Sequence, residues 1–211
     1  GGVRVKPEKK QFIEFLVASG CLKFGDFQLK SGDRSPFFVN LGQADSGAKL
    51  DVVGRTLAEA SLRAFPQASL LFGPAYKGIA LAVAAAAAGW YRHGQDLRFF
   101  YDRKEAKAHG ERGRFIGHLP EPGEAVVMFD DVLSDGGTKV EAIAAIEAAF
   151  QTRPVGIVVA VDRRRRGTPL PTGLPPVAAA IDLSDLCEYL AETGDDVHHQ
   201  ALRRFYEGED K

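Results

Sequence analysis

Several features are scarce or missing in this sequence, and each absence argues against a class of protein. The chain has two cysteines, Cys21 and Cys187, which lie far apart and show no Cys/His spacing typical of zinc ligands. A disulfide-rich domain and a zinc site are therefore not expected. There is also no apolar run of roughly 18 residues and no signal-peptide pattern. We expect a soluble, cytoplasmic protein with two buried, free thiols and no membrane segment.

An excess of charge of one sign is also missing. Of the 211 residues, 27 are Lys or Arg and 28 are Asp or Glu, which gives a net charge of -1. Proteins that bind nucleic acid usually carry a strong positive field, so we expect neither a nucleic-acid partner nor a membrane partner. A chain of this length can bury one sizeable core without a second large domain.

The sequence is organised around one stretch, residues 125–141, in which a strand pattern changes to a helix pattern. The apolar residues 125–129 are followed by Asp130 and Asp131, and a turn of small polar residues occupies 134–138. Helical apolar spacing resumes after this turn. The stretch predicts a buried strand, a glycine-containing loop and a helix.

The loop after the two acids has the composition of an anion site. Thr138 and Glu141 have the spacing of a capping box, so the helix is expected to begin at the glycines with its free N–H groups directed into the loop. These N–H groups and the hydroxyls of Ser134 and Thr138 suit a phosphate monoester. Carboxylates at the carboxyl end of a parallel strand suit sugar hydroxyls or an ion held through water. Together the parts predict a ribose 5-phosphate site, whereas each part alone also fits an ordinary helix cap and turn.

The remaining pattern alternates strands and helices and predicts an α/β fold. Helices are expected at 8–18, at 51–65, from 79 through the alanine run 84–88, after Thr138, and from an N-cap at Ser184 through Phe205. Strands are expected at 24–30, 35–40, 70–72, 97–101, 125–131, 155–161 and 178–183. Because several strands are apolar throughout, the central sheet should be mostly parallel and flanked by helices. Residues 1–45 are expected to form an N-terminal helix-and-hairpin unit, and 46–211 the α/β core.

Three basic segments follow predicted strands. The glycine-bounded loop 73–78 carries Lys77 at the carboxyl edge of a strand, where it could present a cation to pyrophosphate. Residues 102–114 are rich in Lys, Arg and His with glycines nearby, which suits either a solvated loop or a lid over a pyrophosphate leaving group. The arginine run 163–166 fits a solvated charge run, except for Arg163, which directly follows the acid that ends a strand.

Four segments resemble orotate phosphoribosyltransferases, which belong to the type I phosphoribosyltransferase family, and they occur in the same chain order. They are the hairpin sequences Leu-Lys-Ser-Gly at 29–32 and Ser-Pro-Phe-Phe at 35–38, the loop Gly-Pro-Ala-Tyr-Lys-Gly at 73–78, the segment Arg-Lys-Glu-Ala-Lys-Ala-His-Gly-Glu at 103–111, and the acid-and-glycine stretch 125–138. The last resembles the phosphoribosyl-pyrophosphate (PRPP) motif in a Gly-Gly form. The resemblance implies a type I phosphoribosyltransferase fold with a small N-terminal hood.

The resemblance also implies a reaction and its partners. Orotate and PRPP would give orotidine 5'-phosphate and pyrophosphate in de novo pyrimidine biosynthesis. Mg²⁺ would be held mainly through PRPP, with no protein metal ligand. The enzyme would be a homodimer in which Arg103, Lys107 and His109 act across the interface.

Site residues are assigned by the same resemblance, motif by motif. Catalytic roles fall on Lys77, Arg103, Lys104, Lys107, His109, Asp130 and Asp131. PRPP binding falls on these residues together with Lys30, Tyr76, Val132, Leu133, Ser134, Asp135, Gly136, Gly137 and Thr138. Orotate binding falls on Phe38, Val39, Ser134 and Arg163. The guanidinium of Arg163 would be a two-pronged partner for the orotate carboxylate.

Two other functions stay open on the sequence alone. A purine or uracil phosphoribosyltransferase would keep the acid-and-glycine stretch, but it gives no reason for Tyr76 and Lys77 or for the Arg-Lys-Glu segment. A regulator that senses PRPP without chemistry would be expected to add a nucleic-acid-binding module, for which the near-neutral chain offers no candidate. A panel of orotate, uracil, adenine and hypoxanthine with PRPP would separate these functions.

Overall fold

The protein folds around a six-stranded sheet. The computed structural model describes residues 4–105, 111–134 and 137–209. The strands of this sheet are β3 (Leu70–Gly73), β4 (Arg98–Asp102), β5 (Phe115–Gly117), β6 (Val126–Leu133), β7 (Gly156–Asp162) and β8 (Val177–Asp182). Their order is β5-β4-β3-β6-β7-β8, and every neighbouring pair is parallel except β4 with β5. The predicted α/β class with a mostly parallel sheet is confirmed.

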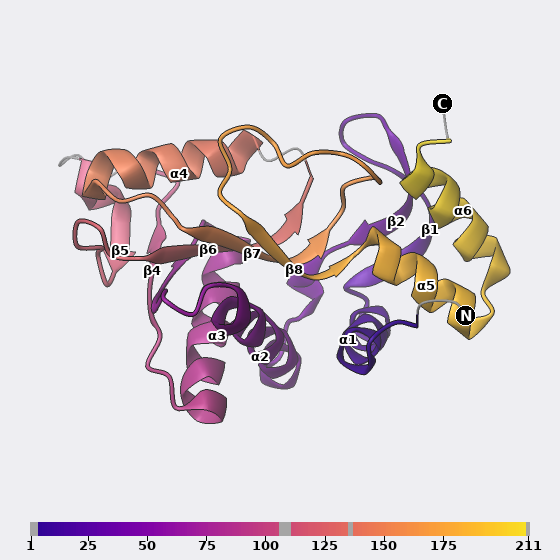
Figure 1. Cartoon of the computed structure of the whole chain (residues 1–211), viewed down its shortest axis with the longest axis horizontal. Coiled ribbons are helices and arrows are strands. Elements are labelled where there is room, and N and C mark those ends of the chain that lie inside the picture. The colour runs from indigo at the N-terminus through magenta and orange to yellow at the C-terminus, as the bar shows by residue number, and fades with distance from the viewer. Residues whose placement is uncertain (1–3, 106–110, 135–136, 210–211) are drawn as a thin grey trace.

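Helices cover both faces of the sheet (Figure 1). One face carries α4 (Gly137–Phe150), and the other carries α2 (Gly47–Ala64) and α3 (Lys77–His93). Strand β6 contributes to both sides, because its side chains alternate. Val126 and Met128 belong to the apolar cluster that contains the α4 residues. Val127 and Phe129 belong to the cluster that contains the α2 and α3 residues. The strand is therefore buried on both faces, as its continuous apolar run predicts.

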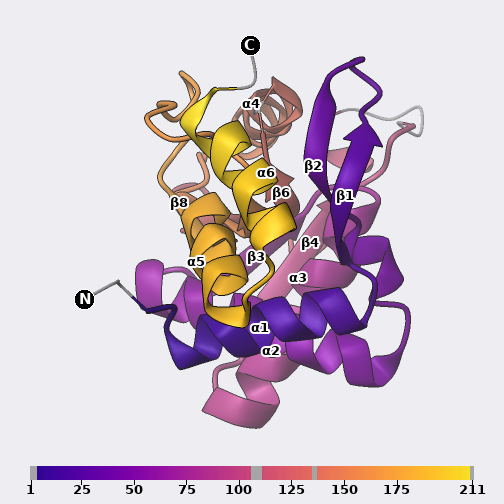
Figure 2. The same cartoon turned by 90° about the vertical axis from the view of Figure 1, so that its right-hand side faces the viewer.

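A two-stranded sheet forms a separate lobe at one end of the core (Figure 1 and Figure 2). Its strands β1 (Leu22–Gln28) and β2 (Arg34–Val39) are antiparallel, as the predicted hairpin requires. The lobe also contains α1 (Pro7–Ala18), α5 (Leu183–Thr193) and α6 (Asp196–Glu207). Elements from both ends of the chain thus meet beside the hairpin.

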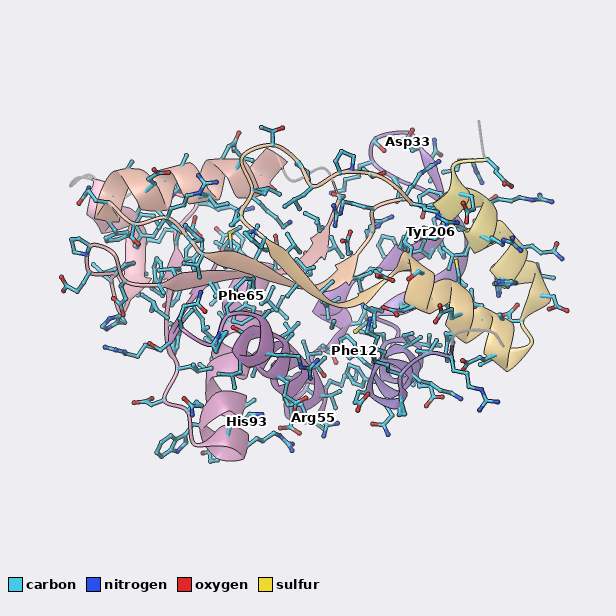
Figure 3. All side chains as sticks on the ribbon, in the orientation of Figure 1. Phe12, Asp33, Arg55, Phe65, His93 and Tyr206 are labelled. Carbon is cyan, nitrogen blue, oxygen red and sulfur yellow. The ribbon has the colours of Figure 1, made fainter. Side chains whose placement is uncertain are left out.

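Direct contacts join the two ends of the chain within this lobe. The ring of Phe37 in β2 meets the ring of Phe205 in α6 edge to face, with 5.7 Å between centroids. Lys9 of α1 forms an ion pair of 2.8 Å with Asp185 of α5. Phe12 of α1 is buried in the same apolar cluster (Figure 3). The hairpin therefore packs against α6, which follows the core in sequence, while α5 is joined to α1.

Helix α2 and strand β5 of the core differ from the prediction. Helix α2 begins at Gly47 instead of 51, because the Ser46 side chain caps it by accepting a hydrogen bond from the Lys49 N–H. The antiparallel strand β5 was not predicted. It has three residues, which are too few to show a periodic pattern.

The C-terminal helices also correct the prediction. The expected cap at Ser184 is wrong: Asp182 caps α5 and forms a capping box with Asp185, while Ser184 lies in the first turn and donates a hydrogen bond to Asp182. The single helical region through Phe205 is in fact two helices. The chain leaves α5 at Gly194, whose φ of 74° lies in the left-handed region that favours glycine.

Both cysteines are free thiols, as predicted. Cys21 is fully buried, whereas Cys187 is only half-buried. Burial, assisted by the negative charge of Glu207, raises the pKa of the Cys187 thiol to about 11. This thiol therefore stays protonated and unreactive at neutral pH. Within the described ranges, no helix combines the length and the apolar character that a membrane crossing needs.

Candidate active site

The candidate site lies where the chain reverses its direction of travel across the sheet. From β3 the chain moves outward to β4, then crosses back to β6 on the other side of β3 and continues outward to β7 and β8. In open α/β sheets, ligands bind outside the carboxyl ends of the two strands at such a switch point. The loop 73–78 follows one of these strands, and the acids Asp130 and Asp131 lie near the end of the other. Topology therefore brings together two segments that the sequence shows separately.

A cavity of about 560 Å³ opens at this switch point, a volume within the usual range for small-molecule sites. The predicted site residues that line it are Tyr76, Lys77, Lys104, Asp130, Asp131 and Thr138. Its lining also includes Asp102, Arg114, Lys139 and Glu141, which were not predicted as site residues. The structure thus gathers cations and carboxylates from three strand ends and the first turn of α4.

The two acids are held by the backbone that follows them. The expectation that the strand ends at Asp131 is wrong, because β6 continues to Leu133, which pairs with Asp162 of β7. Asp130 accepts a hydrogen bond from the N–H of Asp131 at 2.8 Å, and Asp131 accepts one from the N–H of Val132 at 2.9 Å. Both carboxylates are therefore oriented before any ligand arrives.

A buried lysine, which the sequence reasoning missed, is the partner of Asp130. The Nζ atom of Lys139 lies 2.9 Å from the Oδ2 atom of Asp130 and donates a hydrogen bond to the carbonyl of Val132 at 2.7 Å. Only 8% of the Lys139 side chain is exposed. Its sequence signal is a lysine in the first turn of a helix, where the helix dipole disfavours a cation.

Helix α4 begins at Gly137, so the prediction that it starts at the glycines is confirmed. The predicted capping box is wrong, because Thr138 is already the second residue of the helix and cannot be its N-cap. Gly136 and Asp135 lie outside the described residues.

The second acid, Asp131, has an unusual protonation equilibrium. Burial, together with the negative charge of Asp130, raises the pKa of its carboxyl to about 6, although the cation of Lys77 opposes this shift. The Nζ atom of Lys77 lies 3.7 Å from Asp131. At neutral pH the cavity therefore holds an ionised Asp131 carboxylate whose charge is only partly balanced by Lys77.

This arrangement predicts that Asp131→Asn stabilises the ligand-free protein above pH 6. Between the ordinary aspartate pKa of 3.8 and about 6, the folded chain keeps a proton that the unfolded chain releases, so the free energy of unfolding falls as the pH rises through this window. Asparagine does not ionise, so the free energy of unfolding of the variant does not fall in this way. At about pH 7.5 it should be more stable by roughly 1–3 kcal/mol, with the difference vanishing near pH 4. Urea unfolding across this pH range measures the effect.

Asp130→Asn is the matched control for this experiment and should have the opposite sign. It leaves the buried ammonium of Lys139 without its carboxylate, which lowers the free energy of unfolding. If Asp131→Asn is equally destabilising at pH 7.5, the assignment of the elevated pKa to Asp131 is wrong.

The loop 73–78 is fastened to its surroundings by close backbone contacts. A Cβ atom at Gly78 would lie 3.0 Å from the carbonyl oxygen of Phe129, so this position needs glycine. The buried carboxylate of Asp102 accepts a hydrogen bond from the N–H of Ala75 at 2.7 Å. Lys77, the first residue of α3, also lies 3.4 Å from the side-chain oxygen of Asn40, next to β2. The loop thus contacts β4, β6 and the segment that follows β2 in the hairpin lobe.

Two further cations border the same cavity. The ammonium of Lys104 lies over the ring of Tyr76, 4.9 Å from its centroid. The guanidinium of Arg114 pairs with Asp102 at 3.2 Å, and its buried Nε atom has no hydrogen-bond partner among the described residues. Arg103 donates its backbone N–H to the carbonyl of Arg114 at 2.8 Å, so the two ends of the charged segment 102–114 lie side by side. The segment therefore starts and ends at the cavity.

Arg163 lies on the other side of the acids, at the end of β7. Its guanidinium sits 4.6 Å from the centroid of the Phe37 ring and 3.5 Å from the Ser35 hydroxyl, both in β2. Burial lowers the pKa of Arg163, and the nearby charge of Asp131 opposes this shift. Arg163 therefore lies between Asp131 of the core and strand β2 of the hairpin lobe.

The other arginines of the run have separate partners, as the solvated-run interpretation allows. Arg164 binds Asp162 at 2.7 Å, and Arg166 binds Glu207 at 2.7 Å. Arg165 stacks over the ring of Phe205 at 4.0 Å. Arg163 differs from these three in its position beside the acids.

The remaining predicted residues do not line the cavity. Lys30 is exposed at the hairpin, Phe38 is 41% exposed beside Phe27, and Val39 is buried. Arg103 follows β4, and Val132 and Leu133 pack against the core. Ser134, which follows β6, and Gly137, which begins α4, are exposed. Lys107 and His109 lie outside the described residues, as do Asp135 and Gly136. The structure thus places the acids, Lys77 and Lys104 together, with Arg163 adjacent and the hairpin residues farther from the cavity.

Comparison with protein-family models finds no match for the chain. Among curated proteins, the orotate phosphoribosyltransferases of Salmonella newport (strain SL254) and Salmonella typhimurium are each 38% identical to it over 213 residues, which cover 97% of this chain and 99% of each relative. The chain belongs to the orotate phosphoribosyltransferase family. The predicted family, and with it the class of pentosyltransferase enzymes, is confirmed.

Solved structures of orotate phosphoribosyltransferases share the fold. The Francisella tularensis enzyme is 27% identical, with a TM-score of 0.78 over 92% of this chain and 96% of that one. UMP synthase of Leishmania donovani is 28% identical, with a TM-score of 0.74 over 94% of this chain and 42% of that one. A Mycobacterium tuberculosis orotate phosphoribosyltransferase in complex with PRPP has a TM-score of 0.59 at 19% identity, which shows the fold alone.

Proposed function

We propose that this protein transfers the 5-phosphoribosyl group of PRPP to orotate, giving orotidine 5'-phosphate and pyrophosphate. The observation that carries the proposal is the position of the acids between two kinds of cation. Lys77 approaches Asp131 from the β3 side, and Arg163 lies on the β7 side of the same strand. A ribose held by the acids would present its leaving group to Lys77 and its anomeric carbon to a base anchored by Arg163.

Each part of the substrates has a group of residues that fits it. Asp130 and Asp131 accept hydrogen bonds from the ribose hydroxyls, and the loop 134–138 at the start of α4 binds the 5-phosphate. Pyrophosphate is bound by cations and a phenol, namely Lys77, Lys104, Arg103 and Tyr76, with Lys30 from the hairpin. Orotate is bound by its carboxylate at Arg163, with Phe38, Val39 and Ser134 around the ring.

The reaction is a displacement at the anomeric carbon of PRPP. The bond from this carbon to the pyrophosphate oxygen breaks, and its electron pair leaves with pyrophosphate. The orotate N1 forms the new bond and gives up its proton, which leaves with the pyrophosphate product. Positive charge develops on the ribose beside the carboxylates, and negative charge develops on the leaving group beside Lys77 and Lys104. Exclusion of water keeps hydrolysis from competing.

Magnesium fits this site as an ion held by the substrate. Among the described residues, no three Asp, Glu, His or Cys side chains gather as a metal site. Asp130 and Asp131 already face Lys139 and Lys77. Mg²⁺ prefers six oxygen ligands and keeps several waters, so phosphate oxygens of PRPP would supply its ligands. When bound, the ion neutralises charge on the departing diphosphate.

The active unit is a homodimer in which Arg103, Lys107 and His109 complete the site of the partner subunit. An exposed apolar surface next to the cavity supports this arrangement. A hollow of about 650 Å³ on α2 and α3 is lined by residues that include Leu50, Tyr76, Ile79, Val83 and Tyr91. Val83, Tyr76 and Tyr91 are 40%, 67% and 84% exposed. Apolar and aromatic patches of this kind are typical of protein interfaces.

The position of Tyr76 connects this surface with chemistry, because its side chain borders both the hollow and the active-site cavity. A second copy seated on the surface would therefore lie beside the pyrophosphate end of the site. The proposed compartment is the cytoplasm, and the two free thiols suit its reducing conditions.

Arg163→Met is expected to raise the KM for orotate by about 10- to 100-fold, with little change in the KM for PRPP. The variant keeps a side chain that can cover Phe37 but removes the charged partner of the orotate carboxylate. Steady-state kinetics with each substrate varied in turn measures the two constants.

Arg165→Met is the matched control, since Arg165 belongs to the same run but stacks on Phe205 away from the acids. It should leave both constants near their wild-type values. The wild-type enzyme should also use orotate in preference to uracil, adenine and hypoxanthine. Turnover of another base in place of orotate would contradict the proposed function, and an equal rise in both KM values would contradict the role of Arg163.

A further inference from the structure

Lys139 occupies a position that general rules of protein stability disfavour. It is the third residue of α4, where the positive end of the helix dipole repels a cation. Its side chain is 8% exposed, and burial of an ammonium group is costly unless it is paired. Rules of this kind are most often broken at functional sites.

The contacts of Lys139 fix the position of its ammonium group. The hydrogen bond of 2.7 Å to the carbonyl of Val132 ties Nζ to β6, and the ion pair of 2.9 Å ties it to Asp130. The side chain thus reaches back from α4 to β6 across the base of the phosphate loop. Asp130 is held from two directions, by Lys139 at Oδ2 and by the N–H of Asp131 at Oδ1.

Lys77, the other lysine at the acids, is arranged differently. Its side chain is 56% exposed and lies 3.7 Å from Asp131, so it is free to turn toward an arriving pyrophosphate. Lys139 lacks this freedom. Lys77 therefore suits contact with the leaving group, whereas Lys139 suits a fixed position next to the carboxylate that would hold the ribose.

We propose that Lys139 is a positioning residue for the ribose half of the substrate, which acts by holding the Asp130 carboxylate in a fixed orientation. This inference rests on the proposed function, because it assumes that Asp130 binds the ribose hydroxyls. It assigns the buried ion pair to substrate binding instead of to the stability of the fold. It also predicts that ligands with a ribose and ligands without one respond differently to loss of the lysine.

Titration calorimetry tests this prediction. It measures the binding of ribose 5-phosphate and of pyrophosphate to the purified full-length chain, in the oligomeric state that the chain adopts. Lys139→Met should weaken ribose 5-phosphate binding by about 10- to 100-fold, because Asp130 loses its charged partner. It should leave pyrophosphate binding within about twofold, since the Lys77 end of the site is unchanged. Lys77→Met should show the reverse pattern.

Lys9→Met is a matched control that removes a lysine with an equally close carboxylate partner, Asp185, far from the cavity. It should leave both affinities unchanged. Wild-type affinity for ribose 5-phosphate in Lys139→Met, or an equal loss for both ligands, would overturn the positioning role. If instead the wild-type protein binds neither ribose 5-phosphate nor PRPP, the proposed function itself fails.

A second pair of variants keeps the test decisive if Lys139→Met does not fold. The double variant Asp130→Asn with Lys139→Met removes both buried charges and should restore a folded protein by circular dichroism. Since Lys139 acts through Asp130, the double variant should bind ribose 5-phosphate about as well as Asp130→Asn alone. A further loss of about tenfold or more from Lys139→Met in the Asp130→Asn background would show that the lysine acts independently of Asp130, against the inference.

Discussion

Replacement of both Asp130 and Asp131 with asparagine is expected to lower kcat/KM for PRPP by about 10²- to 10⁴-fold. Each carboxylate that loses a charge-assisted hydrogen bond to a ribose hydroxyl costs roughly 1.5–3 kcal/mol of transition-state stabilisation. The removal of negative charge beside the developing positive charge of the ribose acts in the same direction. Initial rates at varied PRPP with saturating orotate give the value.

The fold must be checked separately, because the two substitutions affect stability in opposite directions. Asp130→Asn leaves Lys139 buried without its partner, whereas Asp131→Asn relieves an unfavourable ionised carboxylate. Urea unfolding of the single and double variants measures each contribution. A folded double variant with wild-type kcat/KM for PRPP would remove the acids from the active site.

Mixing two inactive variants is expected to restore up to about a quarter of wild-type activity. One variant carries Lys107→Ala and His109→Ala, and the other carries Asp130→Asn and Asp131→Asn. If the charged segment acts across the dimer, a mixed dimer contains one site with intact acids and an intact segment. Random exchange makes half of the dimers mixed, and half of their sites are then competent.

Mixing two samples of the same variant is the control and should restore nothing. A mass measurement on subunits of different tag length confirms that exchange has occurred. With exchange confirmed and no activity recovered, the segment must serve its own chain. Addition of Val83→Glu to both variants should prevent the recovery, because it places a charge on the apolar surface of α3.

The parts of the site that could be predicted from the sequence are those carried by strand ends. Asp130, Asp131 and Lys77 follow apolar runs, and parallel strands place their carboxyl ends at one edge. Their proximity therefore needs only the strand assignment and the sheet type. The start of α4 at the glycines could also be predicted locally, because the glycine-containing turn directly precedes the helical apolar spacing.

The parts that could not be predicted depend on packing between distant segments. No local pattern indicates that Asp102 accepts a hydrogen bond from Ala75, or that Arg163 meets the ring of Phe37. Lys139 was missed because a single lysine in an otherwise apolar helix pattern usually lies on the solvent side. Its burial depends on Asp130, which is supplied by another element.

The errors at helix starts have a different cause. Short polar side chains compete for the cap position, and neighbouring candidates differ by one or two residues. Thr138 and Ser184 both have the expected chemistry, but each lies inside the first turn of its helix. In α5 the cap is Asp182, whose carboxylate accepts from the N–H of Asp185.

The packing of both chain ends in one lobe affects how the protein folds while it is being synthesised. Lys9 and Asp185 are 176 positions apart, and Phe37 reaches its partner Phe205 only after nearly the whole chain has left the ribosome. The hairpin that carries Phe37 and Ser35 therefore emerges early and is completed last. Contacts of such long sequence separation form slowly, because a large loop must close before they stabilise the fold. The proposed orotate end of the site, where Arg163 meets this hairpin, should be the final region to fold in the newly made protein.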